Sequence, residues 1–438
     1  MSAQNANNKK HAEEQYQYKD WMRLDNAATI YPAISTKRNP SMFRLSMELT
    51  ETVDPEVLKI ALEHTLKRLP GFAQRLRVGL FWHYFEHQDN APPVLPEVNS
   101  PCGYLDGKSN NNFMLRVRYF GKRISTEFFH ALSDGMGAMV FFKTLVAEYL
   151  ILKYNAQIPF DDGLLDCREM PKERETEDSF LKHARPISIG RDEKPAYHMG
   201  GTREAPGVLH IITAQIPLNE IHSKAKEYSA TINELLVAVL IMSVYNIQQR
   251  EARASKKIKP IKVNVPINMR KFYSSHTLRN FTSFVNVGIE PLLGKYSLEE
   301  IIAVVHHTMA LEATEKVLNA KMSTNVTSGR NKAIRITPLF IKNRVMKLIV
   351  DRVGSRASSV TLTNIGLFKL PDEMEKYVDK IVCHLGAGVN PVACSCMSYK
   401  GVCNFTFTRT VTEPFLEREF IGLLVKMGIN VKLESNLK

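Results

Sequence analysis

Apolar and polar residues between 41 and 87 follow a pattern that predicts strands around one helix. Residues 41–49, SMFRLSMEL, have the two-residue period of a half-buried strand. Residues 54–72 change to helical spacing, with Asp54 suited to the N-cap, Pro55 to the first helical position, and a Pro-Gly pair ending the helix. Residues 74–87 then favour a pair of strands.

The pattern up to residue 155 predicts a hairpin followed by a long helix. Residues 113–120 and 123–130 alternate as two strands, and Gly121 and Lys122 between them suit a tight hairpin turn. Residues 137–155 follow as a helix with apolar residues around much of its surface.

The second half repeats this mixture after a change of composition. Residues 161–206 are rich in charge, proline and glycine and poor in apolar runs, which is typical of a connection between domains. Thr231 and Glu234 form a capping-box pattern at the start of an apolar helix. Strands are predicted at 207–217, 261–272 (running into a loop), 283–291, 358–366, 389–399 and 402–411, and helices at 231–249, 297–316 and 412–431.

Strands and helices alternate in both halves without the regular βαβ rhythm of a doubly wound sheet, so the predicted fold class is mixed α/β (α+β) with two similar halves. Single hydrophobic cores stop growing near roughly 250–300 residues. A chain of 438 residues should therefore form two domains. We place a polar disordered tail at 1–20, an N-terminal domain at 21–165, an interdomain connection at 166–206 and a C-terminal domain at 207–438.

The N-terminal 20 residues lack the apolar segment of a secretory signal. The longest apolar run, 235–247, is too short to cross a bilayer. We therefore expect a soluble, cytoplasmic protein without a transmembrane segment.

The six cysteines are too sparse for a disulfide scaffold. Cys394 and Cys396 are separated by one residue, whereas the paired cysteines of zinc sites are usually separated by two to four. Because residues i and i+2 of a strand share a face, we interpret this pair as two small core residues and predict no metal site.

The net charge of +13 favours an anionic partner, either nucleic acid or a phosphorylated cofactor. The densest basic cluster, 253–262, lies at a predicted helix end, where cations are favourable without any ligand. The basic residues are not interleaved with aromatic residues, and no helix-turn-helix or zinc-finger spacing occurs. We therefore expect no nucleic-acid partner.

The segment EFFHALSDGMGAM, 127–139, holds the strongest candidate chemistry. His130 follows a predicted strand and precedes a break, where a side chain leaves the core and reaches a cleft. A neutral imidazole there would act as general base for a hydroxyl that attacks an acyl carbonyl. Asp134 would either orient His130 or brace the loop through an arginine, and Gly135 would allow a tight approach or a positive φ. The alternative is a strand-end histidine, with Asp134 capping the next helix.

Three further histidines are assigned no role. His306 and His307 lie within a predicted amphipathic helix, so one of them faces outward. His384 precedes Leu-Gly-Ala-Gly in a predicted loop.

HALSDG resembles the HxxxDG motif of the superfamily that includes chloramphenicol acetyltransferase, peptide-synthetase condensation domains and alcohol acetyltransferases. VPINMRKF, 265–272, is similar to the Pro-x-Asn-x-Arg stretch of that family, and TNIG, 363–366, to its Ser-Asn-x-Gly loop, with threonine for serine. WMRLDNAATIYP, 21–32, resembles the opening of the bacterial alcohol-acetyltransferase branch. The four matches occur in the expected order and extend over nearly the whole chain.

The resemblance implies two chloramphenicol-acetyltransferase-like domains, each a mixed sheet with helices, and an active-site tunnel at their interface. His130 would be the general base in that tunnel. Asp134 would be structural and would pair with Arg270, whose alternative role is a surface cation. Thr363 would donate a hydrogen bond to the tetrahedral oxyanion and Asn364 would hold that loop. The alternative is that residues 363–366 form a plain turn with no catalytic role.

Two departures narrow the resemblance. Phe129 stands where condensation domains and wax-ester synthases usually carry a second histidine. Trp21 and Trp82 are the only tryptophans, so the late Asp-Phe-Gly-Trp-Gly signature of plant acyltransferases is absent. Both departures favour the alcohol-acetyltransferase-like branch.

The resemblance implies an acyltransferase that moves an acyl group, acetyl by preference, from coenzyme A to a small-molecule alcohol. Acetyl-CoA or another acyl-CoA is a co-substrate, and no bound cofactor is expected. Transfer should be direct, because no serine or cysteine nucleophile lies in an activating motif. We expect a monomer, since both domains lie in one chain. The alternatives are a condensation-type enzyme that joins a carrier-protein-bound acyl thioester to an amine or alcohol, and a non-catalytic relative of the fold.

Overall fold

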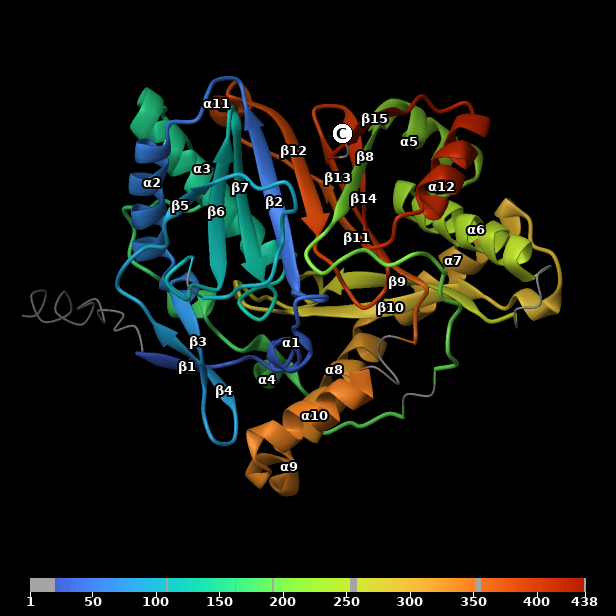
Figure 1. The fold of residues 1–438 in the computed structure, drawn as a ribbon, viewed down its shortest axis with the longest axis horizontal. Coiled ribbons are helices and arrows are strands. Elements are labelled where there is room, and N and C mark those ends of the chain that lie inside the picture. The colour runs from blue at the N-terminus through green and yellow to red at the C-terminus, as the bar shows by residue number, and fades with distance from the viewer. Residues whose placement is uncertain are drawn as a thin grey trace, which may run out of the picture.

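The computed structural model describes residues 20–107, 109–161, 163–190, 193–252, 258–350 and 356–436, which form two lobes side by side (Figure 1). Residues 1–19 of the predicted tail and residues 253–257 of the basic cluster lie outside the described residues. Each lobe contains a mixed sheet and a hydrophobic core of its own, which confirms the predicted mixed α/β class.

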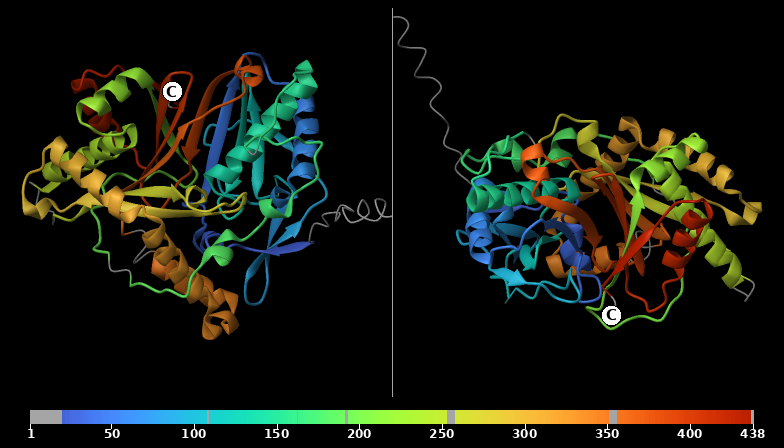
Figure 2. Two further views of the ribbon diagram at one scale, coloured as in Figure 1. Left: turned by 180° about the vertical axis from the view of Figure 1, so that it is seen from behind. Right: turned by 90° about the horizontal axis from the view of Figure 1, so that it is seen from above.

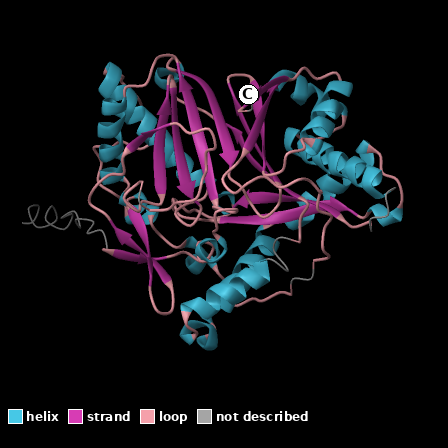
Figure 3. Ribbon diagram, viewed as in Figure 1, coloured by secondary structure: helices cyan, strands magenta, loops and turns pink. Residues whose placement is uncertain are grey.

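The first lobe is a five-stranded sheet in the order β12-β2-β7-β6-β5, with its helices on one face (Figure 3). Its elements are β2 (Met42–Leu49), α2 (Pro55–Arg68), β5 (Val94–Pro96), β6 (Leu115–Phe120), β7 (Arg123–Phe129), α3 (Gly135–Tyr154) and β12 (Val378–Leu385). The Asp54 carboxylate accepts hydrogen bonds from two N–H groups in the first turn of α2, so the predicted N-cap is present. The predicted hairpin joins β6 to β7.

A small antiparallel sheet and a short helix lie at the lower edge of the first lobe in Figure 1. The sheet has the order β1-β4-β3 and consists of β1 (Trp21–Arg23), β3 (Gln74–Val78) and β4 (His83–His87), and η1 (Pro70–Phe72) precedes β3. Helix α1 (Ile30–Ile34) lies next to it. The strand pair predicted at 74–87 is therefore confirmed.

The second lobe is a seven-stranded sheet in the order β10-β9-β11-β13-β14-β8-β15, and its long helices lie on the side away from the first lobe (Figure 1). Cys394 and Cys396 are buried in its core, as predicted. Its elements are β8 (His210–Pro217), α5 (Leu218–Glu227), α6 (Ile232–Ala252), β9 (Ile261–Asn268), β10 (Thr282–Ile289), α7 (Leu298–Glu312), β11 (Val360–Leu367), β13 (Val392–Tyr399), β14 (Val402–Arg409), α12 (Phe415–Lys426) and β15 (Lys432–Ser435).

Strand β12 comes from the second half of the chain but pairs along β2 in the sheet of the first lobe. The prediction that His384 lies in a loop is therefore wrong, because His384 belongs to β12. Residues 381–383 are apolar in succession instead of alternating, and β12 packs against β13 as well as against β2. Burial from two sides removes the alternation by which a strand is detected from sequence.

The remaining elements are helices that lie in the connections between these strands and helices. They are η2 (Glu173–Glu175), α4 (Ser179–His183), η3 (Met269–Lys271), η4 (Pro291–Leu293), α8 (Glu315–Arg330), α9 (Lys332–Ile336), α10 (Leu339–Ile349) and α11 (Asp372–Glu375). Seen from the front and from behind, α9, α10 and the tip of the β3–β4 hairpin project from the same end of the molecule (Figures 1 and 2).

Two helices, α3 and α6, are long and apolar enough to cross a membrane by length and composition alone. Helix α6 contains the run 235–247 and is longer than it. However, 67% and 72% of their apolar windows are buried inside the protein. This burial is typical of helices at the centre of a core.

Candidate active site

His130 stands directly after β7, at the end of the sheet in the first lobe. Its backbone N–H donates to the carbonyl of Ser41 across 2.9 Å, which continues the pairing of β2 and β7. The half-buried imidazole stacks on Tyr31 of α1, with ring centroids 4.4 Å apart and 14° between the planes. Phe43 meets it edge-on at 5.1 Å. Two aromatic rings therefore fix the orientation of the imidazole.

The amide of Asn280 determines which nitrogen of His130 carries the proton. Its Nδ2 lies 3.3 Å from a carboxylate oxygen of Asp25 and 3.4 Å from the carbonyl of Ala131. Because both are acceptors, the amide Oδ1 faces His130 and lies 3.2 Å from Nδ1. An amide oxygen only accepts, so Nδ1 is the protonated nitrogen. Nε2 is left as the basic nitrogen of the ring.

The surroundings of His130 favour the neutral imidazole. Burial lowers the pKa of His130 below its ordinary value and outweighs the opposing effects of Asp134 and Asn280. Burial also raises the pKa of the nearby Asp25 to about 6, against the lowering effect of Arg279. A general base must be unprotonated before it acts, and this environment provides that state near neutral pH.

Asp134 braces the loop and does not orient His130. Its Oδ1 accepts hydrogen bonds of 3.1 and 3.0 Å from two N–H groups in the first turn of α3, so it is also the N-cap. Its Oδ2 accepts from Arg270 Nη1 at 2.9 Å, the N–H of Phe281 at 2.8 Å and the hydroxyl of Thr282 at 2.9 Å. Burial raises the pKa of Asp134, but the charge and hydrogen bonds of Arg270 outweigh it and hold the pKa below its ordinary value.

Arg270 is not the surface cation considered as an alternative. Its side chain is 13% exposed, and besides Asp134 it binds two backbone carbonyls. Nε donates to Thr277 at 2.9 Å and Nη2 to Arg279 at 2.6 Å. These bonds hold the loop that presents Asn280 to His130. The ion pair implied by the resemblance is therefore present, and it positions the partner of the imidazole.

The glycine requirement in HALSDGMG lies two residues later than predicted. Gly135 is the first residue of α3, its φ is not positive, and a Cβ there would meet open space. The expected positive φ or close approach at Gly135 is therefore wrong. A Cβ at Gly137 would lie 2.0 Å from the carbonyl oxygen of Leu278 and 2.4 Å from the hydroxyl of Ser133. Helix α3 approaches the loop before Asn280 at Gly137.

Residues 363–366 form a strand with a bulge and not a plain turn. They belong to β11, whose pairing with β13 shifts register between Asn364 and Gly366. Asn364 Oδ1 accepts from the N–H of Gly366 at 2.9 Å, and Gly366 has a φ of 85°. Asn364 Nδ2 donates to Asn233 Oδ1 of α6 at 2.9 Å. Asn364 therefore holds the bulge, as the resemblance implies, and its hydrogen bonds run within the second lobe.

Thr363 lies on the side of β11 that faces the first lobe. Its register partner on β13 is Ser395. Ser395 donates to the carbonyl of Cys383 on β12 across 2.6 Å. Residues paired in register share a face of the sheet, so the half-buried Thr363 side chain lies on the interlobe face.

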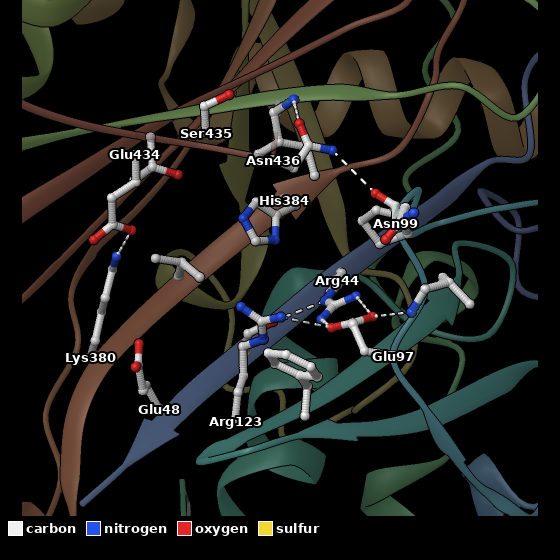
Figure 4. A pocket seen from close by; sticks show the side chains of 17 residues that line it. Arg44, Glu48, Glu97, Asn99, Arg123, Lys380, His384, Glu434, Ser435 and Asn436 are labelled. Atoms are coloured by element: carbon white, nitrogen blue, oxygen red, sulfur yellow. Dashed lines mark hydrogen bonds and ion pairs between the residues drawn. The ribbon is translucent and has the colours of Figure 1, made fainter. Parts of the chain in front are cut away.

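A cavity of about 430 Å³ opens between the lobes (Figure 4). Glu97 accepts hydrogen bonds in it from Arg44 Nη1 at 2.9 Å and from Arg123 Nη2 at 3.1 Å. Arg44 lies three residues after Ser41, so the backbone of this lining residue is roughly 10 Å from that of Ser41, the hydrogen-bond partner of His130. His130 itself is not among its lining residues. The charged and imidazole side chains in the lining are Arg44, Glu48, Glu97, Arg123, Lys380, His384 and Glu434.

His384, for which the sequence pattern indicates no role, lines this cavity. Its ring lies in the centre of the view in Figure 4. Burial, together with the nearby cations Arg44 and Arg123, lowers the pKa of His384 to about 3. The ring is therefore neutral and suited to hydrogen bonding with a ligand.

A second cavity, of about 360 Å³, lies beside α1 and is cationic. Arg38, Arg203 and Lys347 line it, and none of the three has a carboxylate partner within the described part of the chain. The acidic group at this cavity, Glu204, is paired with His210 at 2.8 Å. The cavity therefore carries uncompensated positive charge suited to a phosphorylated ligand. Among the described residues, no cluster of three or more His, Cys, Asp or Glu could hold a metal ion.

No protein-family model and no curated protein matches the chain. Solved structures match over nearly its whole length. The trichothecene 15-O-acetyltransferase of Fusarium sporotrichioides superposes with a TM-score of 0.60 at 11% identity, covering 94% of this chain and 97% of that one. Polyketide synthase associated protein 5 of Mycobacterium tuberculosis gives 0.57 at 12% identity, covering 92% and 96%. The first condensation domain of the CDA synthetase gives 0.57 at 12% identity, covering 93% and 95%.

The chain has the two-lobed fold of acyltransferases and condensation domains. At these identities the likeness establishes the fold, and the chemistry has to be argued from the residues. The fold implied by HALSDG and its companion motifs is therefore confirmed, whereas the roles of the motif residues stay predictions.

Proposed function

We propose that the protein is a coenzyme A-dependent O-acyltransferase that transfers an acyl group, acetyl by preference, to an alcohol. The arrangement of His130 carries this proposal. The imidazole is neutral, Asn280 fixes the proton on Nδ1, and Nε2 is the nitrogen left to accept a proton. This is the state that a general base requires for activating a hydroxyl.

The proposed reaction is direct. Nε2 of His130 takes the hydroxyl proton of the acceptor while the acceptor oxygen bonds to the thioester carbonyl carbon. The tetrahedral intermediate then breaks its carbon–sulfur bond and releases the coenzyme A thiolate, which takes the proton back from the imidazolium. The products are an ester and free coenzyme A, and His130 is neutral again.

We propose that the hydroxyl of Thr363 stabilises the oxyanion of this intermediate. Its place on the interlobe face of β11 supports the role. Removing one such donor typically lowers kcat by about 10²–10³. Thr363→Ala should show this loss, and Thr361→Ala, two residues earlier on the same strand, is the matched control. Equal kcat values for the two variants would refute the proposed role of Thr363 in stabilising the oxyanion.

The cationic cavity beside α1 supports coenzyme A as the donor. Ile34 lines it and lies one helical turn from Tyr31, the ring stacked on His130. Replacing Arg38 and Arg203 by alanine should raise KM for acetyl-CoA about tenfold or more and leave kcat nearly unchanged. The same variant should use S-acetyl-N-acetylcysteamine, a thioester without phosphates, as well as the wild type does. An equal loss with both donors would exclude phosphate binding in this cavity.

The test of the function is thiol release from acetyl-CoA with a panel of alcohols and amines. His130→Ala should lower the acceptor-dependent rate by about 10²–10⁴, whereas His307→Ala, an exposed histidine on α7, should leave it unchanged. Equal rates for wild type and His130→Ala would refute the general-base role. Turnover of a carrier-protein thioester but not of acetyl-CoA would establish the condensation alternative. Failure to bind coenzyme A or to use either donor would favour a non-catalytic relative.

A further inference from the structure

Helices α9 and α10 and the tip of the β3–β4 hairpin project from one end of the molecule (Figures 1 and 2). They carry exposed apolar side chains, which together are here called the α10 surface. The two parts are joined, because the N–H of Leu339 donates to the carbonyl of Leu80 at 2.9 Å and Lys342 Nζ to that of Phe81 at 2.8 Å. The exposed large apolar residues are Val78, Leu80, Trp82, Ile334, Ile336, Phe340, Ile341, Val345, Leu348 and Ile349. Leu80, Ile336 and Phe340 are 71%, 73% and 69% exposed.

Such a concentration is unusual for a surface that faces only water, where large apolar residues are scattered singly. On α10, Ile341, Val345 and Leu348 follow the i, i+4, i+7 spacing of one helix face. They point away from the core, since all three are exposed. The apolar face of α10 is therefore available to a partner.

The positive charge of residues 330–350 limits the kind of partner that can bind this face. Residues 330–350 contain six basic residues, Arg330, Lys332, Arg335, Lys342, Arg344 and Lys347, and no aspartate or glutamate. A second copy of this surface would bring like charges together, which is unfavourable in a symmetric contact. An amphipathic segment with cations beside exposed aromatic and aliphatic side chains has the composition of an interfacial membrane anchor.

We propose that the α10 surface docks on the anionic surface of a phospholipid membrane. The exposed apolar side chains enter the headgroup region, and the cations face the lipid phosphates. The hairpin tip contributes Trp82, an aromatic residue suited to the membrane–water boundary. This proposal rests on exposure and charge and is independent of the proposed acyl transfer.

The docking surface adjoins the candidate site. Helix α10 packs against α1, and α1 carries Tyr31, which stacks on His130. Lys347 at the end of α10 also lines the cationic cavity. A docked molecule would therefore hold the α1 side of the candidate site close to the membrane.

Flotation of the full-length protein with phospholipid vesicles tests the proposal. We expect binding to vesicles in which about a quarter of the lipid is phosphatidylglycerol, and at least about tenfold weaker binding to pure phosphatidylcholine. Ile336→Ser with Phe340→Ser should weaken binding about tenfold or more. The matched control is Leu293→Ser with Leu311→Ser, which changes residues 81% and 71% exposed elsewhere on the molecule.

Charge is tested by a second pair of variants. Arg335→Glu with Arg344→Glu should abolish the preference for phosphatidylglycerol, whereas Lys59→Glu with Lys67→Glu on α2 should retain it. Circular dichroism melting of each variant establishes that it is folded. Absence of vesicle binding by the folded wild type, equal binding to both lipids, or equal binding by Ile336→Ser/Phe340→Ser would overturn the proposal. So would a lipid-free dimer that the same apolar substitutions dissociate, because the surface would then be a contact between two copies.

Discussion

Arg270 donates a hydrogen bond from Nη1 to Oδ2 of Asp134 across 2.9 Å and thereby joins the two lobes. Asp134 begins α3 in the first lobe, and Arg270 follows β9 in the second. The same guanidinium binds the loop that carries Asn280, and Asn280 fixes the tautomer of His130. The state of the candidate base therefore depends on a buried ion pair that does not touch it.

Asp134→Asn should destabilise the protein by about 3–5 kcal/mol, the range found when one partner of a buried ion pair is removed. Asparagine retains the ability to cap α3, so the loss reports on Arg270 and its loop. Asp54→Asn is the matched control, because Asp54 caps α2 in the same way but pairs with Lys153 near the surface. Its cost should be about 1 kcal/mol or less. Equilibrium unfolding in urea measures both, and equal costs would mean that the Arg270 pair contributes no more than the exposed one.

Gly137→Ala should damage the protein and Gly135→Ala should not, although Gly135 is the glycine of the HxxxDG motif. The new methyl group at 137 meets the backbone of Leu278, which cannot move aside like a flexible side chain. Overpacking of this kind typically costs about 1–3 kcal/mol, and the shifted loop should also lower kcat. The methyl group at 135 enters open space at the first position of a helix, where alanine is well tolerated. The melting temperature and kcat of both variants test this prediction. A larger loss of stability or kcat in Gly135→Ala than in Gly137→Ala would contradict the close approach of α3 to Leu278 at Gly137.

Local patterns in the sequence predict most of the fold. The capping residues of α2 and α6 and the hairpin turn at 121–122 lie where the sequence places them. These features depend on neighbours within a few residues. Strand β12 was not predicted, because its pairing with β2 joins residues more than 300 positions apart and its burial on two sides removes the alternation.

The candidate site likewise contains some residues that local motifs predict and others that only the tertiary structure brings together. The HALSDG motif identifies His130 and Asp134 as candidate site residues, and the family resemblance predicts that Arg270 pairs with Asp134. Asn280 belongs to none of the sequence motifs. It lies 150 residues after His130 in the chain, and the two residues are brought together only by the tertiary fold of the loop that follows Arg270. Tyr31 did lie in the early segment 21–32, but its stacking on His130 is a tertiary contact that no spacing reveals.

Asp25 should make stability fall as pH rises through the range from about 4 to 6. Its pKa is raised from 3.8 to about 6 in the folded protein, chiefly by burial. Between these values the folded state binds the proton more tightly than the unfolded state, so the stabilisation is complete below the unfolded pKa and is lost as pH rises through the folded one. Asp25→Asn removes this dependence. Its unfolding free energy should therefore gain on the order of 3 kcal/mol relative to wild type between pH 4 and pH 7. A constant difference between the two proteins would show that Asp25 ionises normally.

The pH dependence of acyl transfer should carry the signature of the His130 environment. Because burial lowers the pKa of His130, the imidazole stays neutral below pH 6.5, and kcat/KM should begin to fall only at a lower pH than an ordinary histidine allows. Asn280→Ala removes the bond that holds the proton on Nδ1, and this bond also raises the pKa slightly. The variant should lose up to about tenfold in kcat, and its acid limb should stay in place or move to still lower pH.

Asn264→Ala, which breaks an amide–amide bond to Asn286 within the second lobe, is the control and should leave both quantities unchanged. Steady-state rates from pH 5 to 8 with saturating acyl-CoA and varied alcohol give both parameters. An acid limb at or above pH 6.5 in the wild type would mean that burial does not control the base. A limb that rises in Asn280→Ala would mean that the amide lowers the pKa instead of raising it, and the tautomer assignment would then be wrong.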